Sequence, residues 1–320
     1  MTITFQGQSI LVTGGAGFIG SHLVEKLVNL QAKVVVVDNL STGHINHLAA
    51  VEKQIDFQQL DLLRDDLRPI LAERQFATLF HMAGNVNVPL SVEDPQYDFE
   101  KNAQMTLNVL QALREASPET ALIYPSSAAV YGRGSATPYR ETDPTFPIAP
   151  YGVSKLTGEH YTRTFASLYG LRTACLRLFA VYGPRLRRQV VYDLIQKLYR
   201  DPHELFIYGD GTQVRDMSHV SNIVDALIIV AARGPLKGEI YNAGTDEFVT
   251  IRQLAEMICQ EMGLSPKFVF SGDVRPGDAQ HWTADLSRLR ALGYQPRLKL
   301  AQGLADVVKW ETTASWKGPI

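Results

Sequence analysis

The sequence feature that most constrains the fold is a glycine-rich segment between a short apolar run and an amphipathic stretch. This segment, TGGAGFIG at residues 13–20, satisfies both G-x-G-x-x-G and G-x-x-G-x-x-G. Glycines at this spacing allow a tight strand-to-helix turn and a close approach of the backbone to a phosphate group. The helix that begins here offers unpaired N–H groups and the positive end of its dipole to an anion. Taken alone, the segment also fits a tight turn that binds nothing.

The second apolar run supplies the context for choosing between these interpretations. Four valines at residues 34–37 end at Asp38, and strands that are apolar on both faces are typical of a parallel sheet covered by helices on both sides. A carboxylate at the end of this strand accepts hydrogen bonds from the adenosine ribose diol and repels a 2′-phosphate. The glycine segment and Asp38 together predict a bound dinucleotide, NAD rather than NADP.

The first half of the chain continues this alternation of strands and helices. Further apolar runs lie at residues 79–80, 122–124 and 174–176, and helical patterns cover residues 97–116 and 151–169. This order predicts an α/β fold with a doubly wound parallel sheet of the Rossmann type.

The second half is less regular and predicts a smaller, α-rich C-terminal domain that binds the substrate. Helical patterns cover residues 190–200, 221–232, 251–262, 285–292 and 301–310, a turn is expected at 208–211 and a strand at 239–242. We assign residues 1–178 to the NAD-binding domain, with residues 218–246 rejoining its sheet. Residues 179–217 and 247–320 form the smaller, substrate-binding domain in this assignment.

The composition excludes several classes of protein. With 31 basic and 33 acidic residues the net charge is −2, so no global field attracts nucleic acid or an anionic membrane surface. Residues 1–9 are too polar for a signal peptide, and no apolar run is long enough to cross a bilayer. Cys175 and Cys259 are expected to be buried free thiols, which fits the reducing cytoplasm. No group of His, Cys and carboxylate residues has metal-ligand spacing, so no metal is expected.

A tyrosine and a lysine four residues apart begin the predicted helix over residues 151–169. Tyr151 and Lys155 share a helical face, and a nearby ammonium, like a cationic nicotinamide ring, lowers a tyrosine pKa from about 10. This arrangement would supply a general base near neutral pH. Ser127 follows the strand over residues 122–125, at the edge of the sheet where an α/β site is built, and its hydroxyl could hold a substrate oxygen. Such Tyr–Lys pairs are often only solvated side chains, so the functional interpretation depends on the glycine segment upstream.

The chain resembles the extended short-chain dehydrogenase/reductase family, and within it the nucleotide-sugar epimerases of the UDP-glucose 4-epimerase type. The resemblance covers about residues 8–310. The matching segments are TGGAGFIGSHL at 13–23, DNLSTG at 38–43, HMAGNVNVPLSVEDP at 81–95, SSAAVYG at 126–132, PYGVSK at 150–155, LRLFAVYGPR at 176–185, GDGTQVRDMSHV at 209–220, NAGT at 242–245 and RPGD at 275–278.

The resemblance implies roles for the matching residues. The cofactor NAD would be held by Gly14, Gly17, Phe18, Ile19, Asp38, Asn39, Ser41, Thr42, Gly43, Asp61, Leu62, Met82, Ala83, Gly84, Asn102, Tyr151 and Lys155. The catalytic residues would be Ser127, Tyr151 and Lys155. A nucleotide-diphosphate sugar would be bound by Asn87, Ser127, Tyr151, Arg215, Arg275 and Asp278. Arginines suit a diphosphate because a guanidinium can bind it with two parallel hydrogen bonds.

Several of these residues also have a purely structural interpretation. Asn87 could cap the backbone instead of touching the hexose, and His81 is expected to be a packed core histidine. Arg185, Arg187 and Arg188 form a basic cluster that is either a solvated loop or a second contact to phosphate. The cluster is too small to indicate nucleic-acid binding in a chain of this net charge.

Two departures from the family pattern bear on the substrate and the reaction. Ala180 replaces the asparagine of the usual F-N-x-Y-G segment, which removes a polar contact and leaves room for a bulkier or charged sugar, such as a uronate or an amino sugar. Ala128 and Ala129 follow Ser127 where related 4,6-dehydratases carry Asp-Glu, so the acid and base for elimination are missing.

The resemblance therefore implies an NAD-dependent nucleotide-sugar 4-epimerase acting on a UDP-hexose, UDP-uronate or UDP-amino sugar. The sugar would be oxidised transiently at C4, rotate as a 4-keto sugar and receive the hydride on its opposite face. The alternatives are a dehydratase, decarboxylase or 4-ketoreductase of the same family, and a catalytically silent dinucleotide-binding protein. A homodimer is expected, because helices 97–116 and 151–169 form a four-helix bundle between subunits in the family.

Overall fold

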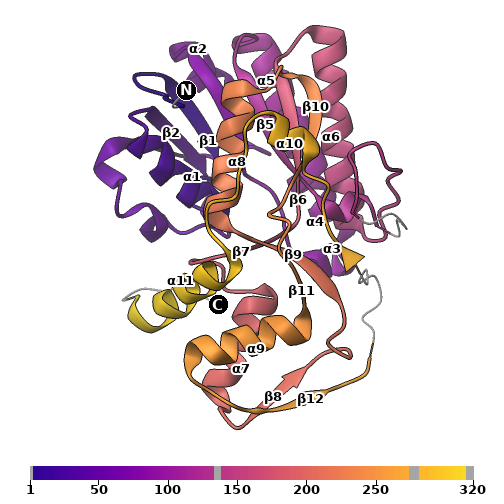
Figure 1. Ribbon diagram of the computed structural model, residues 1–320. Helices are drawn as coiled ribbons and strands as arrows, with labels where there is room; N and C mark the ends of the chain where they lie inside the picture. The colour runs from indigo at the N-terminus through magenta and orange to yellow at the C-terminus, as the bar shows by residue number, and fades with distance from the viewer. Residues whose placement is uncertain (1–2, 133–137, 274–280, 315–320) are drawn as a thin grey trace.

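The computed structural model describes residues 3–132, 138–273 and 281–314. Within these ranges the chain forms a larger part built on a parallel sheet and a smaller part that lies below it in Figure 1. Each part has its own cluster of buried apolar side chains, and the larger part has one on each face of its sheet.

The larger part contains, among the described residues, a seven-stranded parallel sheet with the order β10-β6-β5-β4-β1-β2-β3. Its strands are β1 (Ser9–Thr13), β2 (Lys33–Asp38), β3 (Ile55–Gln59), β4 (Phe76–His81), β5 (Ala121–Ser127), β6 (Thr173–Leu178) and β10 (Lys237–Ala243). The order reverses at β1, which pairs with β2 on one side and β4 on the other. This is the predicted doubly wound sheet, and the predicted strand at residues 239–242 joins it as β10, beside β6.

Helices cover both faces of the sheet because its central strands are apolar on both faces. In β1, Ile10 and Val12 belong to the core cluster that includes Leu23 of α1 (Phe18–Asn29), together with residues of α8 (Val220–Arg233). Leu11 points the other way, into the cluster that includes residues of α2 (Arg68–Glu73), α5 (Met105–Ala116) and α6 (Pro150–Tyr169). Figure 1 shows α8 running across the near face of the sheet.

The predicted helix over residues 97–116 contains an irregular segment. It begins as α4 (Pro95–Phe99), widens into a π-helical turn at Glu100–Gln104 and continues as α5. Single π turns inside α-helices are frequent at functional sites. Asn102, which the family resemblance places behind the cofactor, lies in this turn and is buried.

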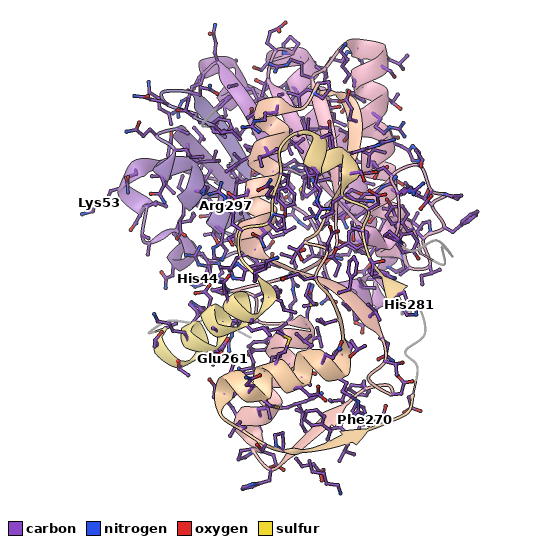
Figure 2. All side chains as sticks on the ribbon, viewed as in Figure 1. His44, Lys53, Glu261, Phe270, His281 and Arg297 are labelled. Carbon is purple, nitrogen blue, oxygen red and sulfur yellow. The ribbon has the colours of Figure 1, made fainter. Side chains whose placement is uncertain are left out.

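The smaller part contains more strand than an α-rich domain implies. Its described strands form two small sheets, one of β7 (Ala180–Tyr182), β9 (Val214–His219), β11 (Phe248–Thr250) and β13 (His281–Trp282) and one of β8 (Glu204–Ile207) and β12 (Lys267–Phe270). Its helices are α7 (Gln189–Arg200), α9 (Ile251–Met262) and α11 (Leu300–Thr313). These strands are too short to show a clear period in the sequence. In Figure 2, Phe270 on β12 marks the end of this part far from the main sheet.

The remaining described elements are short. They are α3 (Val88–Glu93), α10 (Ser287–Ala291) and the 3-10 turns at Ile45–Leu48, Glu52–Gln54 and Ala128–Val130. Helix α10 contacts β10, and Leu289 belongs to a core cluster of the main sheet. The division into two domains remains our proposal. The separate core of the smaller part supports it, and the packing of α10 favours counting that helix with the larger domain.

Candidate active site

The predicted functional residues gather at one edge of the main sheet. Thr13, Asp38, His81 and Ser127 are the last residues of β1, β2, β4 and β5. Parallel strands present their carboxyl ends at one edge, and ligands of open α/β sheets bind there, where the strand order reverses. This edge faces the smaller part of the molecule (Figure 1), and His44 lies on that side of the sheet in Figure 2.

The glycine segment leaves an open cradle between β1 and α1. Gly14 has φ +66°, and a Cβ atom there would clash with the backbone of Ala83. A Cβ atom on Gly20 would clash with the carbonyl oxygen of Gly14. Gly17 is the N-cap of α1 and provides no side-chain cap, so the first N–H groups of the helix, including those of Phe18 and Ile19, are not satisfied by a capping side chain. The cradle fits a pyrophosphate group.

Asp38 is a preformed acceptor at the end of β2. Its Oδ2 accepts a hydrogen bond from Ala16 N at 2.9 Å, and its Oδ1 accepts one from Leu40 N at 2.8 Å. Burial raises the pKa of Asp38, and the two backbone donors act in the opposite direction. Each carboxylate oxygen keeps a further acceptor site, which fits the two hydroxyls of an adenosine ribose.

The residues predicted for the adenosine end surround the loop after Asp38. Asn39 accepts a hydrogen bond from Ser41 N at 3.0 Å and hydrogen-bonds Asp61. Burial is the strongest influence on Asp61 and acts upward, but the Leu63 N–H, Lys101 and Asn39 together hold its pKa below the usual value. Thr42 is exposed, Gly43 is half-buried against Asp38, and Leu62 is buried.

The wall beside the cofactor is formed by the loop after β4 and the π turn. Met82 N donates to Thr13 O at 2.9 Å, and Ala83 N lies 3.4 Å from Thr13 Oγ1. Gly84 has φ +157°, and a Cβ atom there would lie 2.7 Å from Asn102 Oδ1. Among the described residues, Asn102 Oδ1 is buried without a hydrogen-bond partner. A buried acceptor of this kind fits a donor group on a bound ligand.

The structure places Ser127 and Tyr151 in contact and brings Lys155 to the same strand, β5. Ser127 Oγ accepts a hydrogen bond from Ala129 N at 3.2 Å, and the Ser127 side chain also hydrogen-bonds the Tyr151 hydroxyl. Lys155 is buried one helical turn after Tyr151, and its Nζ donates to Pro125 O at 3.2 Å.

The predicted lowering of the Tyr151 pKa by Lys155 alone is wrong. Burial raises the Tyr151 pKa above its usual value, the hydrogen bond from Ser127 lowers it, and the charges of Asp98 and Arg188 act upward and downward. Burial also lowers the pKa of Lys155 to about 8, opposed by Asp98. The four-residue spacing predicts that Tyr151 and Lys155 share a helical face. It does not show that both side chains are buried, and burial is the largest influence on each pKa.

The basic cluster does not behave as one unit. Arg185 donates to Ser21 Oγ at 3.0 Å and to Glu25 Oε1 at 2.5 Å, so it fastens the loop to α1. Arg187 donates to the Tyr192 hydroxyl at 3.2 Å. Arg188 is exposed, and its charge interacts with Tyr151. The alternative of a plainly solvated loop is therefore wrong for Arg185, and Arg188 places a cation near the catalytic tyrosine.

The sugar-nucleotide residues are only partly described. Arg215 lies on β9, half-buried, with its Nη1 donating to Val214 O at 2.9 Å and its guanidinium 5.9 Å from the centre of the Trp282 ring. Ala180 lies on β7, in register with Met217 of β9. Arg275 and Asp278 lie outside the described residues.

Two residues with alternative interpretations have structural roles. Asn87 is the N-cap of α3, and its side-chain oxygen accepts a hydrogen bond from Leu90 N at 3.1 Å. Its placement in the substrate site remains a prediction. His81 is a core residue, as expected, because burial lowers its pKa to about 3 and its Nδ1 lies 2.8 Å from Thr13 Oγ1.

A buried polar network packs against the first turn of α6, and it was not predicted from the sequence. Asp98 accepts hydrogen bonds from Asn85, Asn102 and Ser154. The sequence does contain an indication of it, because Asp98 precedes Asn102 by one helical turn and Ser154 directly precedes Lys155.

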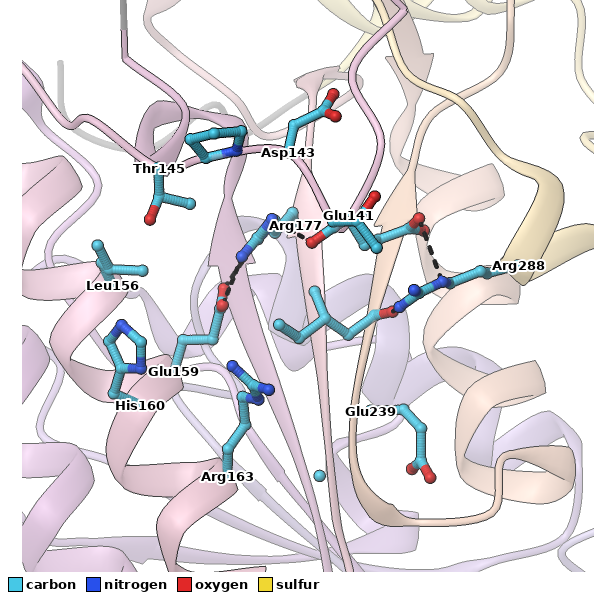
Figure 3. A pocket seen from close by; sticks show the side chains of 14 residues that line it. Glu141, Asp143, Thr145, Leu156, Glu159, His160, Arg163, Arg177, Glu239 and Arg288 are labelled. Atoms are coloured by element: carbon cyan, nitrogen blue, oxygen red, sulfur yellow. Dashed lines mark hydrogen bonds and ion pairs between the residues drawn. The ribbon is translucent and has the colours of Figure 1, made fainter. Parts of the chain in front are cut away.

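A cavity of about 400 Å³ opens away from this site, between α6, β10 and the segment at residues 141–145 (Figure 3). None of the predicted catalytic residues lines it. Arg177 and Glu159 form a buried ion pair at 2.6 Å, and Arg288 pairs with Glu141 at 3.6 Å. Since these charges satisfy one another, we assign the cavity no part in the reaction.

Cys175 and Cys259 are free and buried, as predicted. In the parts of the chain that the structure describes, no group of three or more His, Cys, Asp or Glu residues could hold a metal ion. Over the same residues, no helix combines the length and apolarity that a membrane span requires.

The chain is similar to known proteins both in sequence and in structure. A putative UDP-glucose 4-epimerase from Methanocaldococcus jannaschii is 33% identical over 305 residues, which cover 94% of this chain and 97% of that protein. A UDP-N-acetylglucosamine 4-epimerase from Methanobrevibacter ruminantium, solved with UDP-N-acetylmuramic acid, superposes with TM-score 0.88 at 32% identity and covers 96% of this chain and 99% of its own. A Thermus thermophilus UDP-glucose 4-epimerase, solved with NAD, gives TM-score 0.85 at 32% identity, covering 96% of this chain and 100% of its own.

The family model for the NAD dependent epimerase/dehydratase family matches residues 10–244. The match includes the glycine segment, Asp38 and all three predicted catalytic residues, and it ends just after β10. The chain belongs to the NAD dependent epimerase/dehydratase family.

Proposed function

We propose that the chain is an NAD-dependent nucleotide-sugar 4-epimerase acting on a UDP-hexose, UDP-uronate or UDP-amino sugar. The observation that carries the proposal is the group of Ser127, Tyr151 and Lys155 at the carboxyl edge of the sheet. In the chain, Ser127 is followed by Ala128 and Ala129, which cannot exchange protons. Relatives named as 4-epimerases of UDP-sugars support the choice of substrate class.

The cofactor is NAD, and its site is suited to that molecule. The cradle at Gly14 and Gly17 would hold the pyrophosphate, and Asp38 the adenosine ribose. The adenine would lie near Asp61 and Leu62. The free acceptor of Asn102 would lie along the rest of the cofactor. When bound, NAD accepts a hydride from the sugar and later returns it.

The protein moves the proton through Tyr151. The phenolic oxygen takes the proton of the C4 hydroxyl during oxidation and gives one back during reduction. The Ser127 hydroxyl holds the same substrate oxygen and hydrogen-bonds Tyr151. The Lys155 ammonium favours the phenolate form of Tyr151, since a nearby positive charge stabilises an anion.

The nucleotide is held more firmly than the sugar in this proposal. Arg215, with Arg275 and Asp278, would bind the diphosphate and its ribose. Around the sugar, Ala180 provides space, and Arg188 provides a positive charge near Tyr151. A loosely held 4-keto sugar can rotate in the pocket between the two hydride transfers, and an epimerase requires this rotation.

Other enzymes of the family are the main alternative. A 4,6-dehydratase needs an acid and a base after the strand-end Ser/Thr, and each such group typically contributes roughly 10²–10⁴-fold to a rate. Ala128 and Ala129 can do neither. A catalytically silent protein is disfavoured by the hydrogen-bonded Ser127 and Tyr151 and the buried Lys155.

The test is to incubate the purified protein with UDP-, GDP-, dTDP- and CDP-sugars and to identify the products by NMR. The proposal predicts interconversion of C4 epimers for at least one UDP-sugar. If Arg188 contacts the sugar, a UDP-uronate will have a higher kcat/KM than the matching UDP-hexose. Absence of turnover with every sugar nucleotide, although NAD binds, would favour the silent protein.

We also propose that the protein is a cytoplasmic homodimer. Helix α6 exposes Val153, Tyr161, Leu168 and Tyr169, and Leu168 is 69% exposed. Such an apolar helix face fits pairing with a second copy. Light scattering should give a dimer for the native chain and a monomer for Leu168→Glu. The matched control is Tyr208→Glu, a change at an exposed aromatic residue of the smaller part, which should remain dimeric.

A further inference from the structure

The polar network beneath the catalytic helix is centred on a carboxylate that is closed off from solvent. Asp98 lies on α4 with 0% of its surface exposed. Its Oδ1 accepts hydrogen bonds from Asn85 Nδ2 at 2.7 Å and Asn102 Nδ2 at 3.0 Å. Its Oδ2 accepts one from Ser154 Oγ at 2.6 Å. Three donors around one carboxyl group match an ionised carboxylate, which can only accept.

Each donor belongs to a segment of the proposed active site. Asn85 follows Gly84 in the loop after β4, and Asn102 lies in the π turn beside the cofactor wall. Ser154 precedes Lys155 on α6, and its Oγ lies 3.0 Å from the Tyr151 carbonyl oxygen. Asn102 Nδ2 also lies 3.1 Å from Ser154 Oγ. Asp98 therefore ties the cofactor wall to the first turn of the catalytic helix.

The donors of Asp98 are all neutral, so its charge is not cancelled by a hydrogen-bonded cation. The charge acts on Lys155, where it favours the ammonium form against burial. The other groups that face Lys155 are His81 from β4 and Tyr124 from β5. His81 is neutral near pH 7 because its pKa is about 3, and the pKa of Tyr124 is raised well above its usual value. Among these groups, Asp98 is the one whose charge favours the Lys155 ammonium.

We propose that Asp98 is a positioning residue of the active site, which fixes Ser154 and Asn102 by hydrogen bonds and places a negative charge beneath the first turn of the helix that carries Lys155. The inference rests on the proposed function of Lys155, but it concerns how that lysine is held. Asp98 itself does not touch the reacting atoms in this account.

The test compares Asp98→Asn with the native enzyme loaded with NAD. The substitution keeps the shape of the side chain and removes the charge. The alkaline limb of the kcat/KM profile should move down by about one pH unit, because Lys155 then loses its proton more easily. A carbon-13 NMR titration of labelled lysines, with Lys155→Met to assign the resonance, should show the same shift without any turnover.

The matched control is Glu159→Gln, which removes a buried carboxylate from the same helix as Lys155. Glu159 is also 0% exposed, and it pairs with Arg177. This variant should unfold at a lower temperature and leave the lysine titration and the alkaline limb unchanged. Ser154→Ala keeps the charge of Asp98 and removes one hydrogen bond. This variant should therefore lower kcat without shifting the alkaline limb of the kcat/KM profile.

An unchanged Lys155 titration in folded Asp98→Asn overturns the inference. If that variant does not fold, Asp98→Ser provides the same test, because it also removes the charge and leaves room for water. Failure of the proposed function is distinguishable, since it would leave every sugar nucleotide unconverted while the lysine titration still shifted.

Discussion

At the scale of single residues, the proposed proton transfer depends on a buried tyrosine. The Tyr151 hydroxyl is hydrogen-bonded to Ser127, and burial raises its pKa. A phenol in this setting holds its proton until a positive charge is placed beside it. The oxidised nicotinamide would add a positive charge to that of Lys155, so in this proposal the phenolate forms more readily once the cofactor is bound.

Replacing Tyr151 with phenylalanine should abolish turnover and spare NAD binding. The ring still fills the same space, but the proton acceptor is lost, and such a loss typically lowers kcat by roughly 10²–10⁴-fold. Steady-state kinetics and NAD calorimetry on the same preparation measure both effects. A Tyr151→Phe enzyme with near-native kcat would show that another group is the base.

The activity should also fall as the pH rises through the Lys155 pKa. Burial lowers that pKa to about 8, so Lys155 is mostly protonated below this pH and mostly neutral above it. Because the folded-state pKa lies below the unfolded value of 10.5, Lys155 also adds stability as the pH rises between these two values. A kcat/KM profile from pH 6 to 10 tests the first statement. A profile that stays flat across pH 8 would contradict it.

At the scale of the elements, the turn between β1 and α1 positions the cofactor. Gly14→Ala places a Cβ atom against the Ala83 backbone at a positive φ, which costs about 1–2 kcal/mol before any clash. NAD affinity should therefore fall about tenfold or more. The control is Gly7→Ala, which has the same strained φ of +73° but no atom within 4 Å, and which should leave NAD affinity unchanged. Equal effects of the two changes would place the pyrophosphate elsewhere.

Several elements could be predicted from sequence because their periodicity is strong. The valine run of β2, the glycine turn and the helix beginning at Pro150 all lie where the sequence predicts them. The edge strand β3 was missed because its five residues, IDFQQ, are mixed in character and only half-buried. The π turn at Glu100–Gln104 was not predicted, because a single wide turn leaves the helical pattern of residues 97–116 unbroken. The raised pKa of Tyr151 was not predicted either, because it depends on burial.

Helix α6 is fastened to the sheet by a buried ion pair between Glu159 and Arg177 of β6. Arg177 Nε and Nη2 donate to the two carboxylate oxygens of Glu159 at 3.0 Å and 2.6 Å. Arg177→Gln leaves the buried carboxylate without its cation, so the free energy of unfolding should fall by about 3–5 kcal/mol in a denaturant titration. Arg68→Gln, which removes an exposed ion pair, should leave the free energy of unfolding unchanged. A similar small effect for both changes would mean that Glu159 finds another partner.

At the scale of the whole molecule, the proposed reaction site lies where two separately packed parts face each other. The main sheet would hold NAD along its carboxyl edge, and β7 and β9 bring Ala180 and Arg215 from the smaller part toward that edge. This division separates the cofactor from the groups that choose the sugar nucleotide. It also explains why the cofactor is easier to predict from the sequence than the sugar. The glycine turn is one short segment, whereas the residues proposed for the sugar nucleotide come from segments far apart in the chain.

The most direct test of the central claim is the product mixture formed from the sugar nucleotide that turns over best, followed by NMR. An epimerase needs only the proton transfer at Tyr151 and a sugar that can turn, and Ala128 and Ala129 offer no group for elimination. The account predicts an equilibrium mixture of two C4 epimers with C6 unchanged. A 4-keto-6-deoxy product would contradict it.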